Sequence, residues 1–413
     1  GHLNHLKAAI LITGDEITMG IVNDTNGGYL AETLTAMGYE VQSIVIVQDN
    51  AQFMIREMTG ALERADLLVI TGGLGSTFDD ITLQTVARYA GRSLICDADY
   101  RESLERSFKS RFRRKAPADL ERQAYTVEGS TILPNAAGSA RGCFLKMGAK
   151  EIVVLPGPPM EMKAVFAEAI KHMSRPEAPF MRTVGLVDIT EPEIEKTLEE
   201  LLDKHENVKF VTRVKYYTGP TVILSGPNEE QLEEIVTSLR EKYGENIYTT
   251  TGEELKDVVV KMLVERKKTV STAESCSGGR LSAILTSVPG VSAIFPGGIV
   301  AYSNEAKASL LSVRRETLES FGAVSEETAG EMARGVAAVC GTDIGLSVSG
   351  IAGPSGGSIE KPVGLVCTAI SFGKRSWSYT DRFRGDRETI QLRAAHTIFK
   401  RLWRILWKED YTG

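Results

Sequence analysis

The chain has 413 residues, of which 42% are hydrophobic and 25% charged, and its formal net charge is −6. These values are typical of a soluble globular protein, and the length predicts two to three domains with sizeable cores. A net acidic chain argues against general nucleic-acid binding. Two local basic runs, residues 101–122 and 400–404, carry apolar residues at helical spacing, so we interpret both as solvated helix faces.

The cysteines are five in number, scattered, and form no CxxC pair; they are Cys96, Cys143, Cys276, Cys340 and Cys367. This pattern argues against a disulfide framework or a structural zinc site and suits a reducing cytosol. No apolar run reaches the ~18 residues that span a bilayer, and no signal-peptide pattern is present. We therefore expect a cytoplasmic protein, and we interpret Gly1-His2 as a cloning remnant.

Residues 8–173 alternate apolar strands with amphipathic helices. The strand-like runs are residues 9–13, 41–47, 67–71 and 152–155, and the helices between them carry apolar side chains on one face. Such alternation predicts an α/β domain with a doubly wound, mostly parallel sheet and right-handed crossovers.

Three polar or glycine-rich clusters follow three of these strands: residues 14–16, 72–80 and 156–159. All should lie at the carboxyl edge of the sheet, where open α/β folds bind ligands. Asp79 and Asp80 precede a predicted helix at 81–89, and one of them is expected to cap it. Two adjacent carboxylates, with Asp15 and Glu16 on a neighbouring loop, exceed what a cap needs. Oxygen ligands beside phosphate-binding glycines suit a divalent metal on a diphosphate.

Residues 180–250 predict a small α+β domain of order βαββαβ. The expected elements are strands at 182–187, 208–217, 221–224 and 246–250, and helices at 193–204 and 229–243. No GxxG backbone clamp is present and acidic residues are numerous, so RNA binding is not expected. We interpret this domain as a spacer or dimer scaffold.

From Glu253 onward the pattern is again α/β, and one strand-to-helix turn concentrates the chemistry. A buried strand from Thr269 is expected to stop at 273–274, and a helix to begin near Gly278. Ser275 in this turn is a candidate nucleophile, with backbone N–H groups to hold an oxyanion and Lys307 as a candidate base. The alternatives are that the serines of the turn cap the helix and that Lys307 is an exposed helix lysine.

Cys276 is a rival nucleophile. A reactive thiolate needs an activator, and His396, the histidine of this half, lies in a predicted amphipathic helix from 387 to 406. We therefore prefer Ser275. Because no set of His and Cys ligands appears in this half, we expect no metal or other cofactor there.

Five motifs occur in order: Ala273-Glu-Ser-Cys-Ser-Gly-Gly279, Tyr302-Ser-Asn-Glu-Ala-Lys307, Gly322-Ala-Val-Ser325, Ser349-Gly-Ile-Ala-Gly-Pro354 and Lys361-Pro-Val-Gly364. Together they resemble the C-terminal domain of the CinA (competence/damage-inducible) family, a nicotinamide mononucleotide deamidase. The resemblance implies that Ser275 is the nucleophile, Lys307 its base and Tyr302 an aid to proton transfer. It implies substrate contacts by Cys276, Ser277, Gly278, Gly279, Ser292, Ser349, Gly350 and Arg387. The alternative for Arg387 is a salt bridge with Asp386 or Glu388.

The first domain resembles the molybdopterin-binding-like domain that opens CinA proteins. The matching stretches are residues 14–16, 24–26, 71–80 and 155–161, with Ser76 and Arg141 as departures from the family pattern. The resemblance implies a metal-dependent ADP-ribose pyrophosphatase with metal ligands Glu16, Asp79 and Asp80. The implied substrate contacts are Gly14, Asp24, Asn26, Gly72, Gly73, Gly75, Thr77, Pro156 and Gly157.

The interpretation of the whole chain is a bifunctional enzyme of pyridine-nucleotide recycling. Its expected domains are residues 5–175 (molybdopterin-binding-like), 180–250 (KH-like) and 252–410 (deamidase). It would convert nicotinamide mononucleotide to nicotinic acid mononucleotide and ammonia, and ADP-ribose to AMP and ribose 5-phosphate with a divalent metal. A homodimer is expected, without membrane or nucleic-acid partners. The rivals are binding or adenylylation of molybdopterin by the first domain, and a non-catalytic competence or DNA-damage accessory protein.

Overall fold

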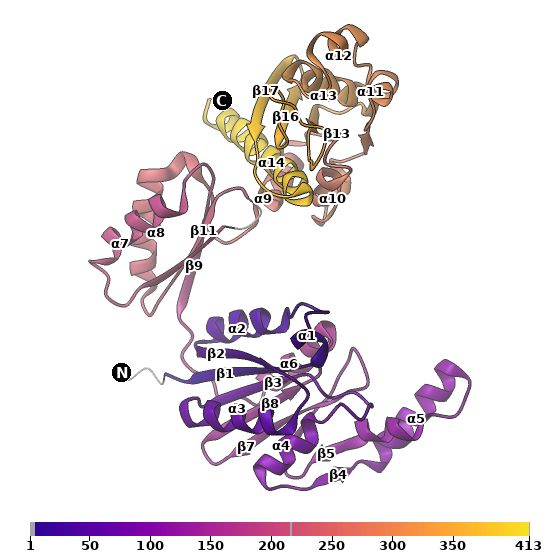
Figure 1. Cartoon of the computed structure of the whole chain (residues 1–413). Coiled ribbons are helices and arrows are strands. Elements are labelled where there is room, and N and C mark those ends of the chain that lie inside the picture. The colour runs from indigo at the N-terminus through magenta and orange to yellow at the C-terminus, as the bar shows by residue number, and fades with distance from the viewer. Residues whose placement is uncertain (1–4, 215–216, 413) are drawn as a thin grey trace. The chain divides into compact units, whose positions relative to one another are not determined.

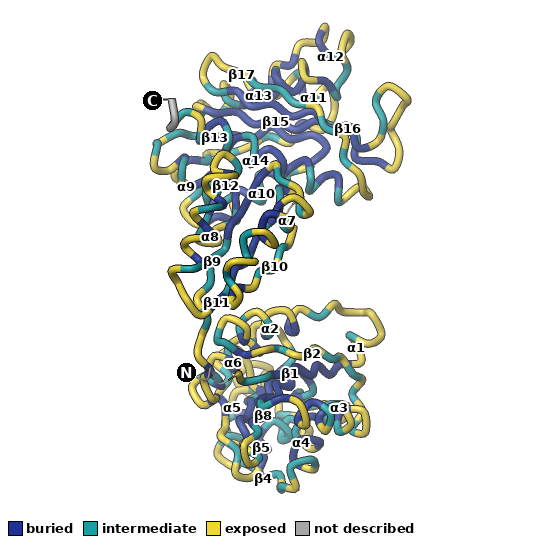
Figure 2. The backbone as a smooth tube through the Cα atoms, turned by 90° about the vertical axis from the view of Figure 1, so that its left-hand side faces the viewer, coloured by how far each residue is buried: buried dark blue, intermediate teal, exposed yellow. Residues whose placement is uncertain are grey.

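The computed structural model describes residues 5–214 and 217–412, with side chains described to Glu409. The chain divides into two compact units, Gly1–Pro179 and Phe180–Gly413 (Figure 1). In both units the central sheet strands are buried, as Figure 2 shows for β1 and β15. Within the described parts of the chain, no helix combines the length and the apolar character needed to cross a membrane.

The first unit contains a six-stranded sheet of order β2-β1-β3-β8-β7-β6. The strands are β2 (Glu40–Val47), β1 (Lys7–Thr13), β3 (Leu67–Thr71), β8 (Lys150–Leu155), β7 (Gly142–Met147) and β6 (Thr131–Leu133). β2, β1, β3 and β8 are parallel, and β7 and β6 continue antiparallel. β3 is buried throughout, as expected for a central parallel strand covered on both faces. The prediction of a mostly parallel sheet is confirmed.

Helices cover both faces of this sheet. α2 (Asn26–Met37) and α6 (Pro159–Ile170) pack on the face that carries Ile10 and Ile12. α3 (Ala51–Arg64) and α4 (Thr82–Ala90) pack on the opposite face, against Leu11. The alternation of side chains along β1 therefore serves two cores. The remaining elements are α1 (Asp15–Thr18), β4 (Leu94–Cys96), α5 (Ala98–Phe112), the 3-10 helix η1 (Ala118–Ala124) and β5 (Tyr125–Val127).

One local expectation in this unit is wrong. Neither Asp79 nor Asp80 caps α4, whose N-cap position is Ile81, without a side-chain cap. The Asp80 carboxylate instead accepts hydrogen bonds from the backbone N–H and the hydroxyl of Thr77, at 3.0 and 2.7 Å. It closes the loop before the helix instead of capping the helix.

The second unit begins with the small α+β module that the sequence predicts. Its elements are β9 (Phe180–Leu186), α7 (Glu191–Leu202), β10 (Lys209–Val214), β11 (Pro220–Gly226), α8 (Glu229–Tyr243), the 3-10 helix η2 (Gly244–Asn246) and β12 (Ile247–Thr249). The antiparallel sheet has the order β10-β11-β9-β12, which confirms βαββαβ. The strand expected at 208–217 ends at Val214, and its predicted residues 215 and 216 lie outside the described residues.

The rest of the unit is an α/β domain with sheet order β14-β13-β15-β16-β17. The strands are β14 (Gly298–Val300), β13 (Val270–Glu274), β15 (Ile344–Gly350), β16 (Leu365–Phe372) and β17 (Arg375–Arg382). α13 (Glu326–Cys340) packs with residues of β13 and β16 in two core clusters. α9 (Leu255–Arg266), α10 (Arg280–Thr286) and α14 (Arg387–Thr412) share another core with β13 and β15. The remaining helices are the 3-10 helix η3 (Val291–Ala293), α11 (Asn304–Leu311) and α12 (Arg315–Phe321).

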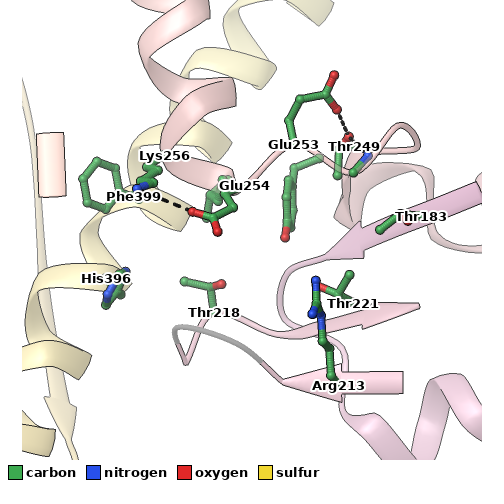
Figure 3. Close-up of a pocket in the computed structure, with 13 residues that line it drawn as sticks. Thr183, Arg213, Thr218, Thr221, Thr249, Glu253, Glu254, Lys256, His396 and Phe399 are labelled. Carbon is green, nitrogen blue, oxygen red and sulfur yellow. Dashed lines mark hydrogen bonds and ion pairs between the residues drawn. The ribbon is translucent and has the colours of Figure 1, made fainter. Parts of the chain in front are cut away.

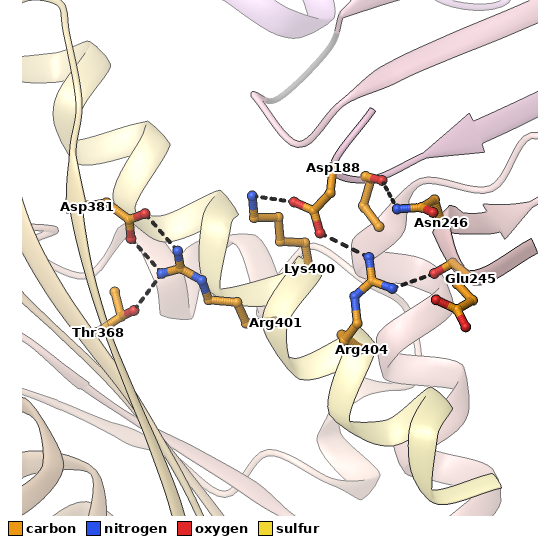
Figure 4. Close-up of polar contacts among 9 residues, drawn as sticks. Asp188, Glu245, Asn246, Thr368, Asp381, Lys400, Arg401 and Arg404 are labelled. Atoms are coloured by element: carbon orange, nitrogen blue, oxygen red, sulfur yellow. Dashed lines mark hydrogen bonds and ion pairs between the residues drawn. The ribbon is translucent and has the colours of Figure 1, made fainter. Parts of the chain in front are cut away.

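The basic run at 400–404 is not a solvated face, contrary to expectation. Asp188, after β9, accepts from Lys400 Nζ and Arg404 Nη2, both at 2.9 Å, and Arg404 Nη1 donates to Glu245 O at 2.6 Å. Arg401 pairs bidentately with Asp381 of β17, at 2.5 and 2.7 Å (Figure 4). The cations of α14 therefore join it to the βαββαβ module on one side and to β17 on the other.

A small cavity of about 90 Å³ lies at the same junction. His396 and Phe399 of α14 line it together with Thr218 and Thr221 of the βαββαβ module (Figure 3). Burial lowers the pKa of His396 to about 4, and the neighbouring positive charge of Lys256 acts in the same direction. His396 is therefore neutral at physiological pH. It lines this cavity with Phe399.

This burial predicts a pH-dependent stability of the second unit. Unfolded His396 binds a proton near pH 6.5, whereas the folded state does so only near pH 4. The free energy of unfolding should therefore fall as pH decreases from about 6.5 to 4, by about 1–2 kcal/mol after solvent screening. Urea titrations at several pH values give the free energy of unfolding, and the slope of this free energy against pH should be shallower in His396→Gln. An equal slope in the variant would contradict the assignment.

Candidate functional site

The turn after β13 is built by two glycines. Gly278 and Gly279 have φ of 58° and 101°, a left-handed conformation that strains other residues. They let the chain reverse from β13 into α10, which begins at Arg280. The backbone N–H of Ser275 still donates to Val348 O of β15 at 2.9 Å. Ser275 therefore lies at the point where the strand ends and the turn begins, as the sequence predicts.

Lys307 reaches the hydroxyl of Ser275. Its Nζ donates to Ser275 Oγ at 3.0 Å and to the backbone oxygen of Tyr302 at 3.0 Å. Ser303 caps α11 by accepting from Ala306 N–H at 3.0 Å, and this short capped helix directs Lys307 inward. The Lys307 residue is 1% exposed, so the alternative of an exposed helix lysine is wrong.

Burial lowers the pKa of the Lys307 ammonium below its ordinary value of about 10.4. Desolvation disfavours the charged form, because the surroundings solvate an ammonium less well than water does. A larger neutral fraction of Lys307 is then available to accept a proton from Ser275 Oγ. The pair thus has both the distance and the direction of pKa shift that a nucleophile and its base require.

Cys276 is poorly suited to nucleophilic chemistry. Its side chain is buried beside the turn, and burial raises the pKa of its thiol to about 12. Its backbone oxygen accepts from Gln391 Nε2 of α14 at 2.9 Å. The thiol is therefore protonated at neutral pH, and position 276 holds the turn through its main chain.

Arg387 and Tyr302 form a second polar pair near the turn. Arg387 Nη2 donates to Tyr302 Oη at 3.0 Å, and Nη1 donates to Gly353 O at 2.6 Å. Arg387 does not pair with Asp386, which accepts instead from the backbone N–H of Thr389 at 2.9 Å. Tyr302 is 60% exposed, so its ring and the guanidinium beside it are available to a ligand from solvent.

Other predicted substrate contacts differ in exposure and in what they bond. Ser277 is buried and donates to Glu274 Oε1 at 2.8 Å. Ser349 is buried and donates to Ala323 O at 2.7 Å. A Cβ at Gly350 would lie 3.0 Å from Cys276 Sγ and 2.9 Å from Leu365 O, so this glycine allows close packing. Ser292 is exposed in η3. The hydroxyls of Ser277 and Ser349 thus serve the protein's own hydrogen bonds.

Sequence reasoning missed Glu274 and Gln391 as parts of this site. Glu274 is a carboxylate at the end of a fully buried strand, and an acid there was the available signal because it needs several donors. Gln391 gave no signal, since a glutamine in an amphipathic helix is ordinary.

The first unit has a cavity of about 490 Å³ at the carboxyl ends of its strands. Ten predicted residues line it: Gly14, Glu16, Asp24, Asn26, Gly72, Gly73, Gly75, Asp80, Pro156 and Gly157. Thr77 and Asp79 do not line it. Asp49, Gln123, Ser139 and Glu161 also line the cavity, and sequence reasoning did not name them as site residues. The three predicted loops therefore meet at one edge of the sheet.

Close backbone approach shapes this cavity. A Cβ at Gly72, whose φ is 109°, would lie 2.2 Å from Thr13 O, and one at Gly75 would lie 2.5 Å from Asp80 Oδ2. Asp24 accepts from the backbone N–H groups of Asn26 and Gly27 at 3.1 and 2.9 Å. The loops that form the cavity therefore pack closely against one another at Gly72 and Gly75. The Asp24 carboxylate fixes the backbone of its own loop.

The departure at Arg141 braces one wall of the cavity. Its guanidinium pairs with Asp97 at 2.9 Å and lies 3.6 Å from the ring centre of Tyr100. Tyr100 Oη in turn donates to Ser139 O at 2.6 Å. Arg141 therefore supports the Ser139 loop indirectly, through the ring of Tyr100.

The donor chemistry of the cavity fits a hard cation in part. Glu16 and Asp80 contribute carboxylates, and Asn26 Oδ1 is buried without a hydrogen-bond partner among the described residues. Oxygen donors of this kind suit a divalent metal. Within residues 5–214 and 217–412, however, no three His, Cys, Asp or Glu side chains are arranged as a metal site.

Comparisons with known proteins agree across the chain. The family model for the CinA C-terminal domain matches residues 252–406, and that for a probable molybdopterin binding domain matches residues 9–176. A CinA-like protein of Thermosipho melanesiensis is 37% identical over 402 residues, 97% of this chain and 99% of that protein. A putative competence-damage inducible protein of Acetivibrio thermocellus is 40% identical over 399 residues, 94% and 95% of the two chains.

Among solved structures, a CinA superfamily protein from Klebsiella pneumoniae is 37% identical and covers 37% of this chain and 96% of its own, with a TM-score of 0.37. These two relatives are 37% and 40% identical over 97% and 94% of this chain, so both matches span the two units. The chain therefore belongs to the CinA family, with a molybdopterin-binding-like first domain and a CinA C-terminal domain.

Proposed function

We propose that the C-terminal domain hydrolyses the carboxamide of nicotinamide mononucleotide to nicotinic acid mononucleotide and ammonia. The observation that carries this proposal is the 3.0 Å contact between Lys307 Nζ and Ser275 Oγ in a buried site. Family membership supports the substrate class. A buried lysine whose described partners are a hydroxyl and a carbonyl costs stability, and such a cost is expected where function requires it.

The proposed reaction runs through an acyl-enzyme. Neutral Lys307 takes the proton of Ser275 Oγ as this oxygen attacks the carboxamide carbon, and backbone N–H groups of the turn stabilise the oxyanion. The C–N bond then breaks, Lys307 returns the proton to the leaving nitrogen, and ammonia departs. Lys307 then takes a proton from water as the water oxygen attacks the ester, and it returns this proton to Ser275 Oγ as the C–O bond breaks and the acid leaves. Arg387, whose planar fork suits a phosphate, binds the mononucleotide phosphate beside Tyr302.

For the first domain we propose hydrolysis of ADP-ribose to AMP and ribose 5-phosphate, with Glu16 and Asp80 holding a divalent metal. A cavity of about 490 Å³ with glycine loops and acidic side chains supports a nucleotide diphosphate ligand. A bound cation would neutralise charge on the diphosphate. The cavity orients the substrate, and the tight Gly72 and Gly75 loops let it approach the backbone. Binding of molybdopterin is the alternative, because the domain type alone does not decide the substrate.

Removing the nucleophile should separate the two turn residues. Ser275→Ala should lower the deamidase rate by about 10³-fold or more while the free energy of unfolding changes by about 1 kcal/mol or less. Cys276→Ala should keep much of the rate, because its thiol is protonated and buried. Product analysis by chromatography, with urea titration of both variants, measures this. An active Ser275→Ala beside an inactive Cys276→Ala would reverse the assignment.

The base can be tested without losing the fold. At pH below its lowered pKa, folded Lys307 carries a buried charge that the unfolded chain solvates freely, so this residue costs stability there. Lys307→Met should thus lower turnover by about 100-fold or more without lowering the free energy of unfolding at pH 7. Wild-type turnover should rise with pH through that pKa. Near-normal turnover of Lys307→Met, or a flat pH profile, would contradict a role as base.

The two chemistries should respond differently to chelation. EDTA should abolish ADP-ribose hydrolysis and leave deamidation unchanged, since the Ser275 site uses serine, lysine and backbone donors. Asp80→Asn should reproduce the effect of EDTA. Asp79→Asn should cost less, because Asp79 lies outside the cavity, and the exposed Asp119→Asn serves as the neutral control. Loss of deamidation with EDTA would point to a metal in the second unit.

A further inference from the structure

A buried carboxylate lies directly beside the proposed nucleophile and has no part in the proposed chemistry. Glu274 is the last residue of β13 and is 0% exposed. An isolated carboxylate in such a place would be strongly unfavourable. Its environment must therefore supply hydrogen-bond donors, and their positions indicate what the residue does.

Four donors converge on Glu274 from the turn and from α10. Oε1 accepts from Ser277 Oγ and from the backbone N–H of Leu281, both at 2.8 Å. Oε2 accepts from the N–H and the hydroxyl of Ser282, at 3.0 and 2.6 Å. The carboxylate thus contacts the middle of the turn and the first turn of the helix that follows. Ser275 lies between the strand residue and these contacts.

These bonds replace an ordinary helix cap. The N-cap position of α10 is Gly279, which has no side chain to accept from the helix N–H groups. Glu274 accepts from two of them across the turn, as a capping carboxylate does. Ser282 Oγ is also 2.7 Å from Thr272 Oγ1 of β13, so strand and helix are joined at two points. Hydrogen bonds therefore connect both ends of the turn that carries Ser275, β13 before it and α10 after it.

We propose that Glu274 is a positioning residue that holds Ser275 Oγ in register with Lys307 Nζ. Gln391 assists from α14 through its bond to Cys276 O. The inference rests on the proposed function for its substrate, whereas the geometry of the Ser275 turn stands by itself. A carboxylate suits this position because it is acceptor-only: one oxygen accepts from each of the two backbone N–H groups, and the two hydroxyls donate to the same oxygens.

The test is Glu274→Gln, which keeps the shape but introduces an NH2 group. At least one of the donors then loses its acceptor, and the turn relaxes. Displacement of a reacting group by about 1 Å can cost about 100-fold in rate. We expect kcat for nicotinamide mononucleotide to fall by about 10- to 100-fold with KM little changed. The pH midpoint of the rate should stay, because Lys307 remains buried.

Glu331→Gln is the matched control. The Glu331 carboxylate also accepts a backbone N–H, that of Arg314 at 2.9 Å, and its side chain is 12% exposed. It should lose comparable stability while keeping kcat. If both variants lose kcat in parallel, or if Glu274→Gln turns over as the wild type does, the positioning role is refuted. A rise in KM at unchanged kcat would refute it as well.

Two further measurements keep the outcome decisive. If Glu274→Gln does not fold, Ser277→Ala and Ser282→Ala take its place, since each removes one hydroxyl donor to Glu274. Each should lower kcat several-fold at constant KM. Wild-type kcat in both variants would refute the positioning role. The second is the rate at which a fluorophosphonate labels Ser275, which should fall about 10-fold in Glu274→Gln. Labelling of a wild type that does not deamidate would overturn the proposed function while still testing this inference.

Discussion

The hydrogen bond between Lys307 Nζ and Ser275 Oγ is the contact around which the candidate site of the C-terminal domain is arranged. It requires a lysine to be almost fully buried, at a cost that simple packing would avoid. Two features offset that cost: a short capped helix directs Lys307 inward, and the Tyr302 carbonyl accepts a second hydrogen bond from its Nζ. Burial then lowers the lysine pKa, so the same feature that is costly for folding enlarges the neutral fraction of the amine.

The serine partner is held from several sides. β13 and β15 fix its backbone through the bond to Val348 O, and two left-handed glycines reverse the chain directly after it. Glu274 joins the turn to α10, and Gln391 joins it to α14. A side chain on a turn would otherwise move with the loop, because loops are more mobile than the elements they connect.

α14 serves more than one part of the second unit. Its N-terminal half contributes Arg387 and Gln391 to the Ser275 site, and its C-terminal half contributes Lys400 and Arg404 to the contacts with Asp188. One helix therefore carries side chains toward both the candidate site and the βαββαβ module. The candidate site of the first unit is built differently. Its cavity forms where three loops meet at the carboxyl edge of a mostly parallel sheet, which is the usual place for ligand sites in open α/β folds.

Periodicity alone was sufficient for the parallel sheet of the first unit and the βαββαβ order of the second, because both depend on local hydrophobic patterns. Motif order was sufficient to place Ser275, Tyr302, Lys307 and the glycine loops in their elements. Local pattern could not show that Asp80, and not Asp79, lines the cavity. It also could not show that the hydroxyls of Ser277 and Ser349 donate to groups of the protein itself. The bonds of Ser349 to Ala323 and of Gln391 to Cys276 join residues distant in sequence. Ser277 and Asp80 bond residues three positions away, in turns whose conformation hydrophobic periodicity does not specify. The same holds for residues 400–404: helical spacing predicts an amphipathic helix, but only the folded chain brings Asp188, more than 200 positions earlier, to its cations.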